Sequence, residues 1–111
     1  MDNCLNILIK NYKGEKGSFI YSLHEKNYFD KELYHEYYHC LSDLKKNNKH
    51  VISTEMLNMI FFTYDYFIRS IIWSLSPNDL SKINNINIED INGHIDELSN
   101  LIMNEYFQNN I

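Results

Sequence analysis

The longest apolar pattern in the chain runs from Thr54 to Leu75, and it predicts a helix. Apolar residues recur there at three- and four-residue spacing on nearly every side. One line of the helix comprises Met56, Ile60, Phe67 and Ile71. A second line comprises Leu57, Phe61, Ile68, Ile72 and Leu75, and a third side is covered by Met59, Phe62, Tyr66 and Trp73. A helix that is apolar nearly all round is normally buried, so we expect the other segments to wrap this one. Phe61 and Ile68 are predicted core sites.

Two charged residues, Asp65 and Arg69, lie in the middle of this helix. Its length would suffice to span a membrane, but charges at mid-membrane depth are costly and rare. The pattern therefore favours a core helix of a soluble protein. Residues four apart share a helical face, so the two side chains predict a local ion pair on a solvent-exposed strip. The alternative is a buried charged pair with a role in recognition.

Weaker helical patterns precede the central helix. Leu5, Leu8, Ile9 and Tyr12 predict a first helix over residues 2–12. The glycine-containing segment 13–17 interrupts it, and Ser18 can cap a short second helix; one long helix broken by the glycines is the alternative. The next helix, capped by Asn27 or Asp30, runs to about Lys46. Its predicted inward face comprises Leu33, Tyr37, Cys40, Leu41 and Leu44.

Two further helix starts follow the central helix, which itself has Ser53 or Thr54 as its cap. The segment 76–79, Ser-Pro-Asn-Asp, has the form of a capping box and predicts a short helix to about Ile83. Asn87 can cap a last helix, whose apolar stripe comprises Ile88, Ile91, Ile95, Leu98, Leu101 and Ile102. No convincing strand pattern appears. We therefore predict an all-α fold: a single domain over residues 1–111, built as a bundle of about four main helices around the buried helix 54–75.

The N-terminal sequence and the two cysteines suggest a cellular compartment. The N-terminal sequence Met-Asp-Asn-Cys lacks the basic flank of a signal peptide, and Cys4 and Cys40 form no CxxC pair. We expect a cytoplasmic protein with reduced thiols.

The net charge of −5 is concentrated in the last third of the chain. Six of the 15 acidic residues follow Pro77 but only one of the 10 basic residues, Lys82, so the rest of the chain is balanced at nine of each. This asymmetry favours a basic partner over phosphate backbones. With Arg69 as the single arginine, a nucleic-acid surface is not expected.

The one match to a catalytic motif is His35-Glu36-Tyr37-Tyr38-His39, which fits HExxH. Two histidines four apart can share a zinc ion, with Glu36 as general base. The resemblance to zincin metalloproteases covers only these residues, and Ser42 and Lys45 stand where the extended metzincin pattern needs Gly and His. We expect a solvated His/Tyr face with no bound metal or cofactor. Phosphate-binding glycine loops and nucleophile elbows are absent.

Two features suggest a binding surface instead. The last helix carries an acidic stripe opposite its apolar one: Asp90, Glu97 and Asn104 are seven apart, and Glu89 and Asp96 form a parallel line. A solvated helix face is the usual explanation for such a stripe. In the third helix, Tyr34 and Tyr38 lie beside the apolar face and can form an exposed aromatic edge with Tyr28, or can pack on neighbouring helices.

A small, acidic, helical chain rich in Asn, Ile, Lys and Tyr, without a catalytic set, resembles the immunity proteins of bacterial toxin systems, including contact-dependent growth inhibition. The resemblance is one of type and rests on no motif, so no site residue carries over. It implies neutralisation of a cognate toxin, often a basic nuclease, through a surface of complementary charge.

We take toxin binding as the leading hypothesis, with the partner contacts placed on Glu89, Asp90, Asp96, Glu97, Tyr34 and Tyr38. A small zinc hydrolase built on His35, Glu36 and His39, and a helical adaptor subunit of a larger complex, are the alternatives.

Overall fold

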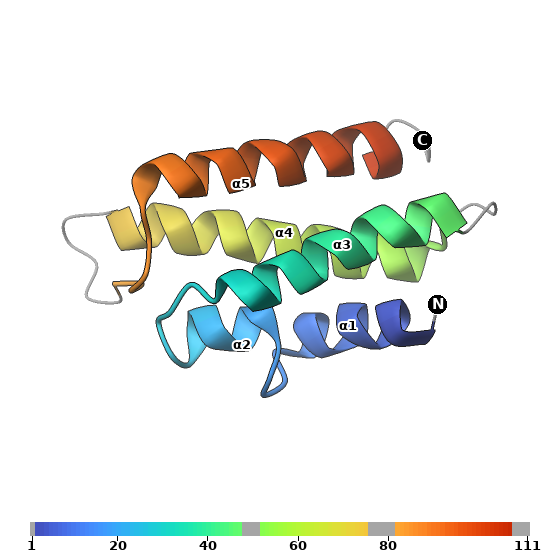
Figure 1. The fold of residues 1–111 in the computed structure, drawn as a ribbon. Coiled ribbons are helices and arrows are strands. Elements are labelled where there is room, and N and C mark those ends of the chain that lie inside the picture. Colours follow the sequence, from blue (N-terminus) through green and yellow to red (C-terminus); the bar gives the residue numbers. More distant parts are fainter. Residues whose placement is uncertain (1, 48–51, 76–81, 108–111) are drawn as a thin grey trace.

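A computed structural model describes residues 2–47, 52–75 and 82–107 of the chain. Its helices are α1 (Asp2–Lys13), α2 (Phe19–His24), α3 (Lys31–Asn47), α4 (Thr54–Leu75) and α5 (Ile88–Leu101), the last continuing into a π-helical segment, Ile102–Phe107. No strand occurs in the described ranges, so the predicted all-α single-domain bundle is confirmed. Figure 1 shows α4 between α5 on one side and α1 with α2 on the other, while α3 crosses in front of it.

Side-chain caps resolve the starts that the sequence left open. Ser18 Oγ accepts a hydrogen bond from the backbone N–H of Tyr21. Asp30, rather than Asn27, caps α3, and Ser53, rather than Thr54, caps α4. The first two helices are separate because Gly14 and Gly17 adopt positive φ angles of 64° and 91°, which end the helical path.

The core is centred on four aromatic rings from different parts of the chain. Phe19 of α2, Phe29 before α3, Tyr34 of α3 and Phe67 of α4 are all at most 1% exposed. Each ring contacts the other three, with centroids 5.3 to 6.0 Å apart. Edge-to-face and offset contacts at these distances add to the free energy gained by burying the rings. This cluster fixes α2, α3 and α4 relative to one another.

The predicted apolar face of the first helix is partly wrong. Leu8 is buried, but Leu5 and Tyr12 are exposed, and Ile7 and Asn11 are buried in their place. Asn11 takes part because its side-chain amide donates to the carbonyl of Ile7 and accepts from the N–H of Ile20. The buried amide is therefore hydrogen-bonded both as a donor and as an acceptor, and its bond to Ile20 ties α1 to the start of α2.

The central helix is where the sequence predicted it, but its burial on nearly all sides is wrong. Its buried residues are Ile60, Thr63, Phe67, Ser70 and Ile71. The predicted core sites Phe61 and Ile68 are only partly buried. Further round the helix, Phe62, Ile72, Trp73 and Leu75 are exposed. The local apolar pattern does not state how many neighbours a helix has, and α4 has too few to cover all its sides.

The remaining predictions concern the last third. The predicted short helix begins in residues 76–81, outside the described part of the chain, and Lys82 and Ile83 after it are not helical. Asn87 caps α5 as predicted, accepting from the N–H groups of Glu89 and Asp90. Ile88 is exposed, although the sequence placed it in the apolar stripe, whereas Ile91, Leu98 and Ile102 are buried.

None of the helices in the described ranges combines the length and apolar character needed to cross a membrane.

Candidate functional site

A backbone clamp brings the start of α5 beside the start of α3. The N–H of Phe29 donates to the carbonyl of Asn84 at 2.9 Å, and the N–H of Asn84 donates to the carbonyl of Asn27 at 2.7 Å. Asn85 adds a side-chain bond to the carbonyl of Phe29. Asn27 and Asn85 have positive φ angles, a conformation that asparagine tolerates better than most residues. The asparagine-rich turns therefore set the relative position of two helices that are distant in sequence.

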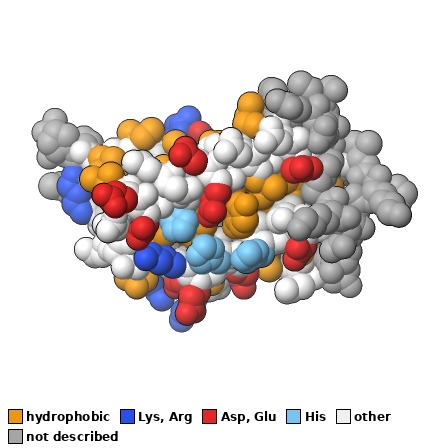
Figure 2. Space-filling model, turned by 45° about the horizontal axis from the view of Figure 1, so that its top comes forward, with side chains coloured by type: hydrophobic (Ala, Val, Ile, Leu, Met, Phe, Trp, Pro, Cys, Tyr) orange, Lys and Arg blue, Asp and Glu red, His pale blue; other side chains and the backbone are white. Residues whose placement is uncertain are grey.

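The clamp creates one continuous surface, which we call the α3/α5 surface. Figure 2 shows histidine side chains gathered near the centre of this face, with aspartate and glutamate side chains around them. The ring centroids of His35 and His94 are 5.5 Å apart and those of His35 and His39 are 6.1 Å apart. We define the surface by Lys31, His35, Tyr38 and His39 of α3 with Glu89, Asp90, His94 and Glu97 of α5.

Beneath this surface, a buried tyrosine holds the polar groups of α5. The hydroxyl of Tyr34 lies 2.8 Å from Oε1 of Glu97 and 2.9 Å from the carbonyl of His94. The same carboxylate oxygen lies 3.2 Å from Nδ1 of His94, whose side chain is only 16% exposed. Burial and the neighbouring Glu97 carboxylate raise the pKa of Tyr34, so its hydroxyl remains a hydrogen-bond donor.

The exposed part of the surface is mainly acidic. Glu89, Asp90 and Glu97 line a shallow hollow of about 450 Å³, together with Lys31, His35, Gly93 and His94. Nζ of Lys31 lies 3.5 Å from Oδ2 of Asp90. Because both side chains are about half exposed, their ion pair adds little to stability. Three carboxylates therefore face one lysine, and the histidines add positive charge only when they are protonated.

The structure brings most of the predicted binding residues together but not all of them. Asp96 is exposed but is not among the residues that line the acidic hollow, and it points about 200° away from His94 around α5. The expected exposed ring at Tyr34 is wrong: the ring is fully buried in the aromatic core, and the packed alternative is the correct one. Tyr38 is half-buried, with its ring centroid 6.3 Å from that of Tyr34, and Tyr28 is exposed.

The HExxH residues do not form a closed set. His35 and His39 are exposed on one face, but Oε1 of Glu36 lies 3.2 Å from Nζ of Lys10 in α1. Within the part of the chain that the structure describes, no three His, Cys, Asp or Glu side chains are placed to hold a metal ion.

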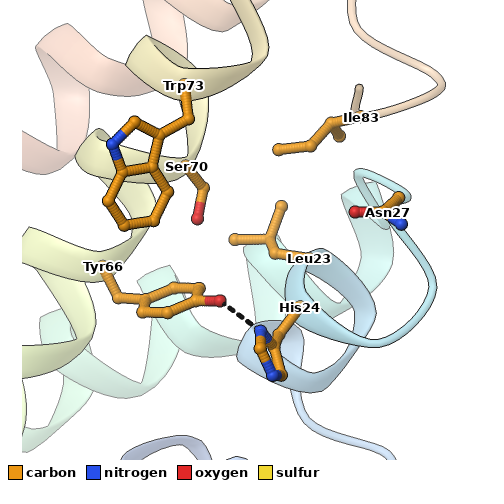
Figure 3. Close-up of a pocket in the computed structure, with 7 residues that line it drawn as sticks. All are labelled: Leu23, His24, Asn27, Tyr66, Ser70, Trp73 and Ile83. Carbon is orange, nitrogen blue, oxygen red and sulfur yellow. Dashed lines mark hydrogen bonds between the residues drawn. The ribbon is translucent and has the colours of Figure 1, made fainter. Parts of the chain in front are cut away.

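A second hollow, of about 410 Å³, lies between α2 and α4 (Figure 3). Tyr66 and Trp73 stand on the α4 side, with Leu23 and His24 of α2 opposite them. The hydroxyl of Tyr66 lies 2.7 Å from Nδ1 of His24, which orients the ring. The residues that line this hollow are both polar and apolar. None of them is a residue that the sequence predicted for binding.

Sequence reasoning missed His94 and Lys31 as members of the site. His94 lies in the acidic helix, but nothing local shows that it meets His35, which is 59 positions earlier in the chain. Comparisons with protein families, curated proteins and solved structures find no match to this chain.

Proposed function

We propose that this protein is an inhibitory binding partner of a basic protein, an immunity protein for a nuclease toxin, and that the α3/α5 surface makes the contact. The observation that carries the proposal is the charge of α5, which has Glu89, Asp90, Asp96 and Glu97 but no lysine or arginine. Three of these carboxylates, Glu89, Asp90 and Glu97, line one hollow of this surface. A cluster of exposed carboxylates is suited to a basic protein partner.

The mechanism is competition for the same electrostatic field. A nuclease must be basic where its substrate phosphates lie. Carboxylates held on a preformed helix speed the encounter with such a surface and exclude nucleic acid from it. The bond from Tyr34 to Glu97 contributes by fixing one carboxylate before the partner arrives, which lowers the ordering cost of binding.

The test begins with the protein encoded by the adjacent gene. We expect this protein to arrest growth when it is expressed alone, and co-expression of our chain to restore growth. Purified together, the two should form a stable complex whose association rate falls as salt rises. An adjacent product that is harmless, or that does not bind, would contradict the proposal.

A matched pair of charge reversals locates the surface. Asp90→Lys and Asp96→Lys change the charge equally, on exposed positions of the same helix, but only Asp90 lies in the α3/α5 surface. We expect Asp90→Lys to slow association about tenfold or more, and Asp96→Lys to have a much smaller effect. Equal effects would mean that net charge alone matters. Glu97 is left unchanged because its reversal would disturb Tyr34.

The zinc hydrolase alternative has its own control. Glu36→Gln removes the carboxylate that an HExxH enzyme needs as general base. Protection against the toxin should be unchanged in this variant. Loss of protection, with the fold intact by circular dichroism, would favour the catalytic alternative.

A further inference from the structure

The side of α4 that faces away from the core has a regular pattern. Asn58, Phe62, Asp65, Arg69 and Ile72 are all exposed, and they follow one another at spacings of four, three, four and three residues. We call this line the outward seam of α4. Alternating spacings of three and four are those of the contact positions in a coiled coil.

Apolar residues flank the seam on both sides. Met59, Tyr66 and Trp73 follow one edge, each seven residues after the last. Phe61, Ile68 and Leu75 follow the other edge with the same period. Trp73 is 47% exposed and Leu75 is 58% exposed, and the other four are partly buried. A long, mainly apolar strip on a monomer usually marks an interaction surface.

We propose that the outward seam of α4 binds a second copy of this chain, with the two α4 helices antiparallel. The seam is symmetric about position 67: Phe62 and Ile72 are equally distant from it, and so are Asp65 and Arg69. A two-fold axis at this point places Phe62 against Ile72 of the second copy. It also places Asp65 of each copy against Arg69 of the other. Such reciprocal contacts are what a self-complementary two-fold interface requires.

The two charges select this arrangement. Within one copy, Nε of Arg69 lies 3.0 Å from Oδ2 of Asp65, and both side chains are about 60% exposed. The antiparallel pair would bring the two ion pairs together as four groups of alternating sign. A parallel pair would set Asp65 against Asp65 and Arg69 against Arg69, and such like-charge contacts are unfavourable. The pair therefore provides direction in a seam that is otherwise mainly apolar.

The register also brings a large side chain beside a hollow of the other copy. A hollow of about 270 Å³, lined by Tyr12, Glu55, Asn58 and Met59, lies near the start of the seam. The two-fold axis brings Trp73 of the second copy beside Met59, and so beside this hollow. In its own copy, Trp73 lines the other hollow, between α2 and α4 (Figure 3), and its ring packs edge-on against Tyr66 with centroids 6.5 Å apart. The register therefore places a half-exposed indole beside a hollow of the opposite copy.

This inference does not depend on the proposed function. The inward side of α4 faces α3, because the hydroxyl of Tyr37 bonds to the carbonyl of Ile60 and the rings of Tyr34 and Phe67 touch. The outward seam is on the opposite side of α4. A dimer would therefore leave the α3/α5 surface of each copy open.

The expected dimer is weak. Stable interfaces use about 20–30 residues from each partner, and one face of a single helix supplies about half of that. We therefore expect a dissociation constant in the micromolar range. Sedimentation velocity on the full chain, from about 1 to about 500 µM, should show a shift from monomer to dimer as concentration rises.

A charge-swap series tests the register. Asp65→Arg and Arg69→Asp each put four like charges at the two-fold axis, and each should weaken the dimer at least tenfold. An equimolar mixture of the two variants should form a heterodimer, because one chain is then positive at both positions and the other is negative. The double variant Asp65→Arg/Arg69→Asp should regain homodimerisation.

The outcomes are decisive in both directions. Both positions are exposed, so each variant should keep the helical circular dichroism of the original, which separates loss of dimer from loss of fold. A chain that remains monomeric up to the highest concentration would overturn the proposal. So would a dimer that is insensitive to the single reversals, or a mixture of the two variants that shows no heterodimer.

Discussion

The inward and outward sides of α4 carry similar residues in different surroundings. Ile60, Phe67 and Ile71 are at most 4% exposed, and all three belong to the hydrophobic core. Phe62 and Ile72 differ little from them in chemistry, yet they are 47% and 60% exposed. The comparison teaches that hydrophobicity sets how much free energy burial can release, whereas neighbouring elements decide whether it is released.

The largest difference between the two sides should appear with phenylalanine. Phe67→Ala should lower the free energy of unfolding by about 3–5 kcal/mol, because it removes a ring that touches three others. Phe62→Ala, on the exposed side, should cost about 1 kcal/mol or less. Urea unfolding at low micromolar concentration, followed by circular dichroism, measures both. Similar losses at the two positions would break the comparison.

Adjacent isoleucines give a tighter match. Ile71 and Ile72 are neighbours at the same end of α4, but Ile71 is 4% exposed and Ile72 is 60% exposed. Ile71→Ala should cost about 2–5 kcal/mol, and Ile72→Ala about 0.5 kcal/mol or less. The same urea experiment applies. If the Ile72 variant became markedly less stable only at high protein concentration, that result would support burial of Ile72 in the proposed dimer.

Alkaline pH should lower the stability of the fold through tyrosines that are buried in the core, two of which contact the inward side of α4. Burial raises the pKa of Tyr37, whose hydroxyl bonds to the carbonyl of Ile60, and burial likewise raises those of Tyr34 and Tyr106. In the unfolded chain a tyrosine ionises near about pH 10. Above that pH the unfolded state binds fewer protons than the native state, so stability is intact below about pH 10 and falls as pH rises.

A spectrophotometric titration followed together with circular dichroism tests this. Part of the tyrosine absorbance change should appear only as the helices unfold. Tyr37→Phe should reduce that late fraction, with Tyr12→Phe, at an exposed position of α1, as its control. Complete titration with the helices intact would contradict the assignment.

The smallest effect should come from the charges on the outward seam. Asp65→Asn removes an exposed ion pair within one helix, which is worth about 0.3–0.5 kcal/mol in a monomer. Thermal unfolding at low concentration should therefore change little. A loss above about 1 kcal/mol in dilute solution would mean that the pair already supports the monomer, and would weaken its assignment to contacts between copies.

Much of the fold could be predicted from the sequence because helices and their caps are local. The bounds of α4 coincide with the predicted range, and Ser18 and Asn87 cap helices as their spacing indicated. Hydrogen bonds within a few residues and the 3.6-residue period depend on no distant contact. The acidic character of α5 could likewise be read directly from the residues.

Only the tertiary structure decided which sides of these helices are covered. Periodicity allowed three sides of α4 to be buried. The positions of α1, α2, α3 and α5 leave the outward seam exposed, apart from the contact of Phe62 with Tyr12 of α1. Tyr34 moved from a predicted contact to the core because its ring fills the space between α2 and α4, and its hydroxyl reaches Glu97 across a gap of 63 positions in the chain. The proximity of the His35 and His94 rings likewise results from the packing of α3 beside α5. Such contacts depend on how helices pack, and packing is a property of the whole chain that no local pattern contains.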